Sequence, residues 1–167
     1  MIFQSKVHNT NLYNTLLVLS RNLFFYKKIG LPDTFETRIY LMFFHFSILM
    51  IVTKKKNSKF DQKTYDYIFH NIENNLRELG FGDVSVNKKM KEFNKILYDI
   101  LLKLDLKNLN NKDFKINTDI VKNYFTSLND RKNDQLYEFT NYFLNFYNFC
   151  FELTLDNMLK ELENFKY

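Results

Sequence analysis

The side chains able to do chemistry are few in this sequence, and their spacing does not assemble a metal or nucleophile site. The three histidines, His8, His45 and His70, lack the short spacings at which zinc ligands recur. The single Cys150 has no histidine or cysteine near it in sequence, and it excludes an intramolecular disulfide. We therefore expect no bound metal, and we interpret His45, within an apolar run, as a core residue.

The glycines and the carboxylate pairs do not indicate catalysis either. Gly80 and Gly82 are followed by Lys88, but a phosphate-binding loop needs a further glycine, a fixed spacing to the lysine and a preceding strand. Glu73 and Glu78 flank an arginine, which is typical of ion pairs on a helix surface. No pattern resembles a nucleophile elbow. We therefore expect the protein not to be an enzyme and to hold no cofactor.

Charged residues near these glycines are better candidates, for binding a partner. Lys88, Lys91 and Lys95 recur at steps of three and four residues, which places them on one helix face with Lys89 beside them. Such a face binds RNA, anionic lipid or an acidic protein, or it is simply solvated. Three further charged residues cluster at the glycines, where they cap helix ends or bind a partner: Arg77, Glu78 and Asp83.

Two amphipathic helices must position these residues. The apolar residues before the glycines recur at helical steps and are Tyr65, Ile68, Ile72, Leu76 and Leu79. Those after the glycines do the same and are Val86, Met90, Phe93, Leu97, Ile100 and Leu104. Gly80 stands where a helix ends in the left-handed backbone region, and Gly82 loosens the turn that follows. The stretch 60–104 therefore predicts a helical hairpin with a specified corner.

Composition predicts an all-α fold. The chain has 167 residues, 46% of them apolar, with only three glycines and one proline. So few turn-forming residues favour long helices joined by few loops over a sheet. We predict a single domain, residues 1–167, folded as a bundle of about six helices around the central hairpin. The net charge of +5 is concentrated in residues 1–110, which suits an acidic partner without selecting one.

The other expected helices follow from periodicity and turn signals. They cover residues 11–28, 39–52, 118–128, 135–153 and 156–165, with a polar linker over 105–117. Asp33 and Glu36 have the spacing of a capping box, which predicts that Asp33 caps the second helix. That helix is apolar on nearly every side but short for a bilayer core of about 30 Å. We expect it to be buried centrally, with a membrane-surface helix as the alternative.

The lysines that follow the central helix are expected in a solvated loop. They are Lys54, Lys55, Lys56 and Lys59, and they are natural contact points if the protein touches a bilayer or RNA. The N-terminal stretch 1–28 resembles neither a secretory signal nor a transit peptide, because its apolar stretch 12–19 is interrupted by polar residues and is followed by Arg21 without a small-residue cleavage site.

The helix expected over 135–153 carries more aromatic rings than one core contact requires. The rings are Tyr137, Phe139, Tyr142, Phe143, Phe146, Tyr147, Phe149 and Phe151. In one account the helix is sandwiched between neighbouring helices. In the other, one face that includes Tyr142 and Phe146 forms an open groove for an apolar partner segment.

Two motifs of this sequence resemble those of a known family. The stretch LRELGFGD at 76–83, followed by VNKKMK at 86–91, resembles the signature LREMGVGDxxVxKxMK of the ubiquinol–cytochrome c chaperone family. Upstream, the family pattern fY…GvPDT…R…LH is matched by Phe25-Tyr26, Gly30-Leu31-Pro32-Asp33-Thr34, Arg38 and His45. The resemblance spans residues 12–104. One departure is that Tyr98 is followed by Asp99-Ile100, where the family has Gly-Arg.

This resemblance implies a non-enzymatic assembly factor for ubiquinol–cytochrome c reductase, respiratory complex III. Family members bind newly made cytochrome b, near the ribosome and together with a small partner protein. A bacterial member is then expected to be cytoplasmic and peripheral to the inner membrane, with contact to anionic lipid and no specific DNA binding. The sequence contains no haem-ligand motif, so we expect no bound haem. The residues expected to bind partners are Pro32, Asp33, Thr34, Arg38, His45, Arg77, Glu78, Gly80, Gly82, Asp83, Lys88, Lys89, Lys91, Lys95, Tyr142 and Phe146.

Two other functions stay open from the sequence. A ribosome- or RNA-associated protein would use the basic hairpin alone, which predicts salt-dependent RNA binding that is lost when Lys88, Lys91 and Lys95 are replaced. A lipid- or small-molecule-binding bundle predicts a closed cavity of a few hundred cubic ångströms among the aromatic rings, whereas a chaperone predicts an open groove.

Overall fold

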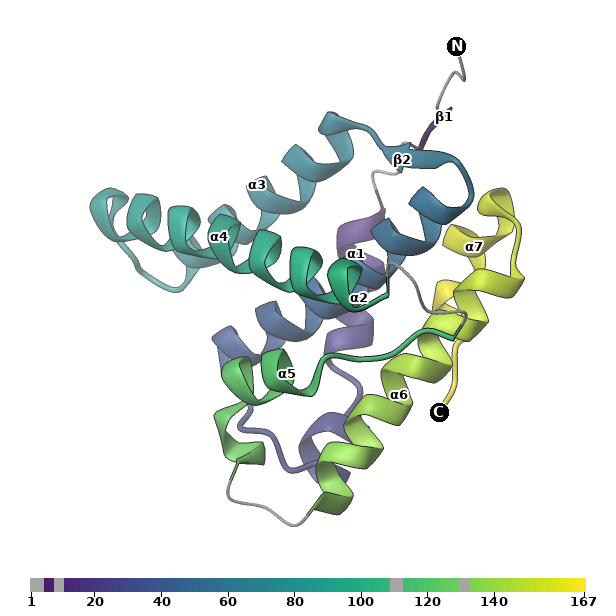
Figure 1. Ribbon diagram of the computed structural model, residues 1–167. Coiled ribbons are helices and arrows are strands. Elements are labelled where there is room, and N and C mark those ends of the chain that lie inside the picture. The colour runs from purple at the N-terminus through teal and green to yellow at the C-terminus, as the bar shows by residue number, and fades with distance from the viewer. Residues whose placement is uncertain (1–4, 8–10, 109–112, 130–132) are drawn as a thin grey trace.

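The computed structural model describes residues 5–7, 11–108, 113–129 and 133–167, which form a helical bundle (Figure 1). Its seven described α-helices, against about six expected, are α1 (Leu12–Ser20), α2 (Phe35–Lys55), α3 (Gln62–Glu78), α4 (Asp83–Lys107), α5 (Thr118–Tyr124), α6 (Asn133–Glu152) and α7 (Leu155–Glu161). The shorter elements are the π-helical turn η1 (Phe24–Lys28), the 3₁₀ turns η2 (Thr126–Leu128) and η3 (Leu162–Asn164), and the strands β1 (Ser5–Val7) and β2 (Ser58–Phe60). The expected all-α fold is confirmed.

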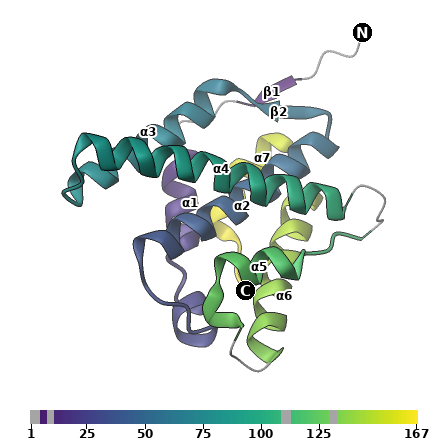
Figure 2. The ribbon, with the colours of Figure 1, turned by 60° about the vertical axis from the view of Figure 1, so that its left-hand side comes forward.

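Helix α2 is the centre of the bundle because its side chains are apolar on nearly every side. It contacts α1, α4 and α6 (Figures 1 and 2). Between residues 39 and 52 every side chain is buried except Tyr40 and Met50, which are half-buried. Helix α2 has the length and composition of a membrane span, but most of it lies inside the bundle. The expectation of a centrally buried helix is therefore confirmed.

Helices α3 and α4 form the predicted hairpin, whose corner lies at the edge of the molecule in both views (Figures 1 and 2). Gly80 has a φ of 93°, in the left-handed region that glycine adopts without strain. The N–H groups of Gly80 and Phe81 donate to the carbonyls of Arg77 and Leu76 at 2.9 and 3.2 Å. These are the two bonds of a Schellman motif. Gly82, in contrast, has extended backbone and caps the start of α4.

Two details of the hairpin differ from the sequence expectation. Leu79, expected in the apolar stripe, is 58% exposed, because it is the cap residue that follows the last turn of α3. Helix α4 continues past residue 104 to Lys107 and is stopped by the buried Asn108. The Asn108 amide donates to the carbonyls of Leu104 and Lys115 at 2.7 and 2.9 Å and accepts the N–H of Lys115 at 2.6 Å.

The single helix expected over residues 11–28 was a wrong prediction. Helix α1 ends at Ser20, whose hydroxyl donates to the carbonyl of Leu17 at 2.8 Å. The side chain of Asn22 then accepts the N–H of Phe24 at 3.0 Å. Short polar side chains compete in this way with helical backbone bonds, and the helix is interrupted before η1 begins. The helix expected over 118–128 is likewise divided, at Phe125, into α5 and η2.

A short parallel pairing between β1 and β2 was not predicted from the sequence. Ser5 lies opposite Ser58, and Val7 lies opposite Phe60. Strands of three residues contain too little alternation to produce a periodic signal. The pairing joins the start of the chain to the connection between α2 and α3.

Helix α6 is sandwiched between its neighbours, as the first of the two accounts required. Its completely buried rings are Phe139, Tyr142, Phe143 and Phe146. They contact Phe25 of η1, Phe44 of α2 and Phe165 at centroid distances between 4.6 and 6.0 Å. Cys150 is buried on the same helix. The alternative of an open groove on this face of α6 was wrong, because neighbouring side chains cover it.

Candidate partner-binding surface

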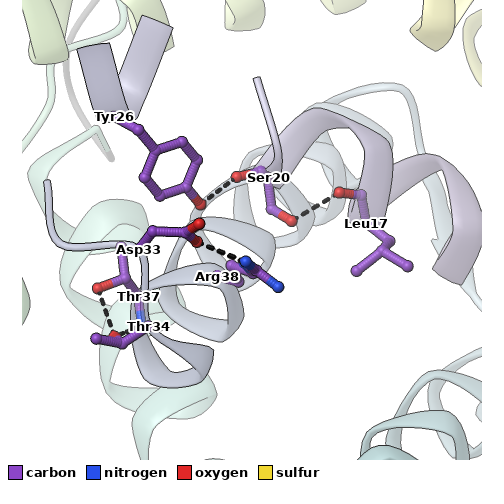
Figure 3. Close-up of polar contacts among 7 residues, drawn as sticks. All are labelled: Leu17, Ser20, Tyr26, Asp33, Thr34, Thr37 and Arg38. Carbon is purple, nitrogen blue, oxygen red and sulfur yellow. Dashed lines mark hydrogen bonds and ion pairs between the residues drawn. The ribbon is translucent and has the colours of Figure 1, made fainter. Parts of the chain in front are cut away.

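The turn between η1 and α2 is held by side-chain hydrogen bonds (Figure 3). Thr34 caps α2, because its Oγ1 accepts the N–H of Thr37 at 3.2 Å. The prediction that Asp33 caps this helix was wrong. Asp33 instead accepts two hydrogen bonds at Oδ1 from Arg38, from Nε at 2.8 Å and from Nη2 at 2.6 Å. Threonine and aspartate both cap helices well, so the sequence did not separate these neighbours.

Tyr26 fastens η1 to the end of α1. Its hydroxyl donates to the carbonyl of Ser20 at 2.7 Å (Figure 3). Burial raises the pKa of Tyr26 above its ordinary value, which keeps the phenol neutral and able to donate. This bond and the Asp33–Arg38 pair bring the end of α1, η1 and the start of α2 together as one edge of the molecule.

The corner of the hairpin carries a network centred on Arg77. Its guanidinium donates to Asp83, and to Glu73 with an Nη2–Oε1 distance of 3.0 Å. The Asp83 carboxylate, followed by that of Glu73, raises the pKa of Arg77. The expected surface ion pair between Glu73 and Arg77 is confirmed. Because the network is exposed it stabilises the fold little, and it shapes the corner instead.

The two family-like motifs meet at one hollow of about 250 Å³ between α1, α2 and the end of α3. Arg38 comes from the first motif, and Glu78 and Leu79 come from the second. The remaining lining residues are Tyr13, Leu17, Arg21, Phe35, Ile39, Met42 and Asn75. The Asn75 amide donates to the Tyr13 hydroxyl and so joins α3 to α1. We call this hollow the motif pocket.

A second hollow of about 250 Å³ adjoins the motif pocket, because Arg21 and Arg38 line both. Tyr26 and Asp33 also line it. Arg21 is exposed and has no ion-pair partner among the described residues. Sequence reasoning missed Arg21, since it belongs to neither motif and only the fold brings it beside Arg38.

Exposed apolar side chains lie at the corner and continue from the motif pocket. We call Leu79, Phe81 and Val84 the corner patch; Val84 is 85% exposed. Lys89 lies over the Phe81 ring, with Nζ 5.1 Å from the centroid, and its Nζ is 3.5 Å from a carboxylate oxygen of Glu36 in α2. Exposed apolar groups gathered at one place are a common feature of binding surfaces.

The basic residues of α4 lie on its outer side. Lys88, Lys91 and Lys95 are exposed and have no ion-pair partner in the parts of the chain that the structure describes. Lys89 differs from them, because it is half-buried between the corner and α2. The ammonium groups of Lys88, Lys91 and Lys95 are therefore available to a negatively charged partner.

Three of the residues expected to bind a partner lie in the core. His45, Tyr142 and Phe146 are completely buried, so none of them reaches the surface in this structure. The interpretation of His45 as a core residue is confirmed. Pro32, Asp33 and Thr34 are exposed in the turn before α2, and Arg38 is half-buried there.

The lysines after the central apolar run do not form the solvated loop that was expected. Lys54 and Lys55 belong to α2 itself, and Lys54 pairs with Asp105 of α4 at 2.7 Å. Lys56 donates to the carbonyls of Phe151 and Leu153, each at 2.7 Å. These bonds tie the end of α2 to α4 and to the end of α6, while Lys59 is exposed in β2.

The chemistry available at this surface is recognition by apolar contact and hydrogen bonding. Its apolar walls stand beside the guanidinium groups of Arg21 and Arg38 and the carboxylate of Glu78. Within the described residues, no group of three or more His, Cys, Asp or Glu side chains could hold a metal ion.

Comparison with known proteins assigns the chain to a family. The family model described as ubiquinol-cytochrome C chaperone matches residues 27–159. The match begins later than the expected resemblance over 12–104 and extends into α7. It contains the whole of the second motif and the first motif from Gly30 onward. Comparisons with curated proteins and with solved structures give no match. Because the family model covers most of the sequence, the chain belongs to the ubiquinol-cytochrome C chaperone family.

Proposed function

We propose that this protein is a chaperone in the assembly of ubiquinol–cytochrome c reductase, and that it binds cytochrome b before this subunit joins the complex. The observation that supports the proposal most directly is the meeting of the two motifs at the motif pocket, beside the corner patch. A single shared site is the expected result if both motifs serve one binding function.

The motif pocket suits side chains of a polypeptide better than a whole small molecule. Its volume of about 250 Å³ lies below the range of roughly 300–1,000 Å³ that small-molecule sites occupy. Leu17, Phe35 and Leu79 offer apolar contact. Arg38 and Glu78 offer hydrogen bonds to a client backbone. Binding involves no covalent step, and a small contact area allows the client to be released to the complex.

On this proposal the basic face of α4 meets the negatively charged surroundings in which cytochrome b is made. Lys88, Lys91 and Lys95 contact ribosomal RNA or anionic lipid, both of which bind lysine clusters electrostatically. The protein is then cytoplasmic and peripheral to the inner membrane, with a small partner protein bound beside the client.

The experiment compares two pairs of substitutions in a strain that lacks the gene. The first pair, Leu79→Asp with Val84→Asp, places charges in the corner patch. The matched control, Leu102→Asp with Leu106→Asp, changes residues of α4 that are 58% and 57% exposed, far from the corner. Assembled cytochrome b is measured from reduced-minus-oxidised difference spectra, and direct binding is measured by crosslinking to cytochrome b.

We expect the corner variant to weaken client binding by about tenfold or more, since each lost apolar contact costs about 1.5 kcal/mol. The control variant should restore cytochrome b to the wild-type level. Normal assembly of cytochrome b in the deletion strain itself would end the proposal. If the corner variant and the control variant supported cytochrome b assembly equally, the corner patch would not be part of the client-binding surface.

A second candidate function is RNA binding through the basic face alone, because its three ammonium groups have no intramolecular ion pair among the described residues. It predicts RNA affinity that falls steeply with salt. The variant with Lys88, Lys91 and Lys95 all changed to Gln would lose that affinity, and cytochrome b assembly would be unaffected by the gene deletion.

A further inference from the structure

A larger pocket of about 360 Å³ lies at the other end of α2, between α2, β2, α3 and α4. We call it the α2-end pocket. It shares no lining residue with the motif pocket. On α2 the motif pocket is lined by residues up to Met42 and the α2-end pocket by residues from Phe46 onward, so the nearest lining residues are about 6 Å apart along the helix axis at 1.5 Å per residue. Its apolar lining consists of Phe46, Met50, Ile51, Phe60, Tyr65 and Leu101.

The carboxylates around this pocket are already bound within the protein. Asp105 accepts from Lys54 at 2.7 Å. Asp61 caps α3 by accepting the N–H of Thr64 at 2.9 Å. Both negative charges are therefore compensated, one by an ammonium group and the other by the positive end of a helix dipole.

The neutral polar side chains at the pocket are occupied as well. Gln62 donates to Asp66 at 2.7 Å, and the Tyr65 hydroxyl donates to Asn94. Lys59 is the exception, because its exposed ammonium group has no hydrogen-bond or ion-pair partner among the described residues. The pocket thus combines an apolar interior with one uncompensated positive charge at its mouth.

We propose that the α2-end pocket binds an acyl chain that carries an anionic head group. The chain lies against Met50, Phe60 and Leu101, and the head group pairs with Lys59. The volume falls at the lower end of the range for small-molecule sites, about 300–1,000 Å³. Neither motif contributes to this pocket, so the inference is independent of cytochrome b binding.

An acyl chain fits this pocket better than a polypeptide does. A peptide carries an N–H and a C=O at almost every residue, and each of these needs a partner when it leaves water. Gln62 Nε2, the Tyr65 hydroxyl and Asp61 Oδ1 already make hydrogen bonds within the protein. A hydrocarbon chain makes no such demand, and its anionic end meets the exposed ammonium group of Lys59.

The test measures binding of palmitate to the purified full-length chain by displacement of a fluorescent fatty acid. Leu101→Trp fills the pocket and should abolish binding. Lys59→Glu should weaken it about tenfold, Lys59→Arg should retain it, and hexadecanol, which lacks the charge, should bind about tenfold more weakly than palmitate. These factors are those expected for one charge-assisted contact of about 1.4 kcal/mol.

Two matched controls separate this site from the rest of the surface. Leu17→Trp fills the motif pocket, and Lys88→Glu removes a lysine from the basic face of α4; both should bind palmitate as the wild type does. Circular dichroism and thermal unfolding establish that each variant is folded. Met50→Trp, which fills the same space from α2, replaces Leu101→Trp if the latter does not fold.

A vesicle arm distinguishes the sources of the acyl chain. Flotation with phosphatidylglycerol vesicles that is abolished by the filling variant supports a phospholipid as the ligand, and binding of palmitate alone supports a free fatty acid. Binding to neither overturns the proposal. So does palmitate binding that persists in the folded filling variants, or capture of an apolar peptide at this pocket without palmitate. Loss of palmitate binding with normal cytochrome b assembly would leave the proposed chaperone function standing.

Discussion

His45 of α2 and Tyr142 of α6 are joined by a hydrogen bond of 2.9 Å in the centre of the bundle. The Nδ1 atom of His45 lies 2.7 Å from the carbonyl of Leu41, which can only accept, so Nδ1 carries the proton. Nε2 therefore accepts from the Tyr142 hydroxyl, and the ring is neutral. Complete burial lowers the pKa of His45 to about 3, because water no longer stabilises the charged form.

This buried histidine makes stability depend on pH. Its pKa falls from an ordinary value of 6.5 to about 3 on folding, so the unfolded chain binds a proton that the folded chain does not over that interval. The stabilisation is fully present above pH 6.5 and is lost as the pH falls toward 3. Between pH 7 and pH 5 we expect the free energy of unfolding to fall by about 2 kcal/mol more in the wild type than in His45→Gln.

Urea unfolding at the two pH values measures this difference. Glutamine retains one donor and one acceptor for Leu41 and Tyr142, so the variant is expected to fold. His70→Gln, at an exposed position of α3, serves as the control and should keep the wild-type slope. If His45→Gln left the pH dependence of the free energy of unfolding unchanged, the His45 ring would not be held neutral in the folded protein.

Gly80 and Gly82 should respond differently to the same substitution. An added Cβ meets nothing within 4 Å at either position, so space does not separate them. Gly80 has a φ of 93°, which strains any other residue, whereas Gly82 has a φ of −76°. We expect Gly80→Ala to lower the free energy of unfolding by about 1 kcal/mol or more and Gly82→Ala to lower it by only a few tenths. Chemical denaturation tests both, and equal effects would contradict the assignment of the corner.

The identity of the α2 cap can be tested in the same way. Thr34→Ala removes the acceptor for the N–H of Thr37 and should cost about 1 kcal/mol, whereas Asp33→Ala removes only an exposed pair with Arg38 and should cost less. If Asp33→Ala lowered the thermal stability more than Thr34→Ala did, Asp33 would be the cap of α2.

Asn108 should be among the polar residues most sensitive to replacement. Asn108→Ala leaves the carbonyl and N–H of Lys115 without the bonds that they now make to its side chain. We expect a loss of about 2–3 kcal/mol in the free energy of unfolding. Asn71→Ala, which removes one exposed bond to the carbonyl of Tyr67, is the control and should have little effect.

The long elements were predictable because their periodicity is strong and their packing agrees with it. The hairpin combines two apolar stripes with Gly80, whose position between them indicates a helix end in the left-handed backbone region. Helix α2 is apolar on nearly every side, which indicates central burial. Asp33 and Thr34 are adjacent and both residue types cap helices well, so the sequence alone does not predict which of them caps α2. At the break after Ser20, the side chains of Ser20 and Asn22 bond to the backbone, and such bonds have no periodic signature in the sequence.

The candidate site was predictable only in part. The motifs singled out Arg38 and Glu78, but they did not predict that these residues meet at one pocket, which requires the packing of α1 against α3. Arg21 and Tyr13 join that pocket through the fold alone. Tyr142 and Phe146 were expected to face a partner, because ring content does not reveal which rings the neighbouring helices cover.

The buried Cys150 can serve as a probe of how often the helical bundle opens. Thiols react as thiolates, and burial raises the pKa of Cys150 while neighbouring side chains exclude reagents. A maleimide should therefore leave this sulfur unmodified for as long as α6 stays packed, so that the rate of alkylation measures how often the core is breached. Because the native thiol is unreactive, a fluorophore can be attached through a cysteine introduced anywhere on the surface, without first replacing Cys150.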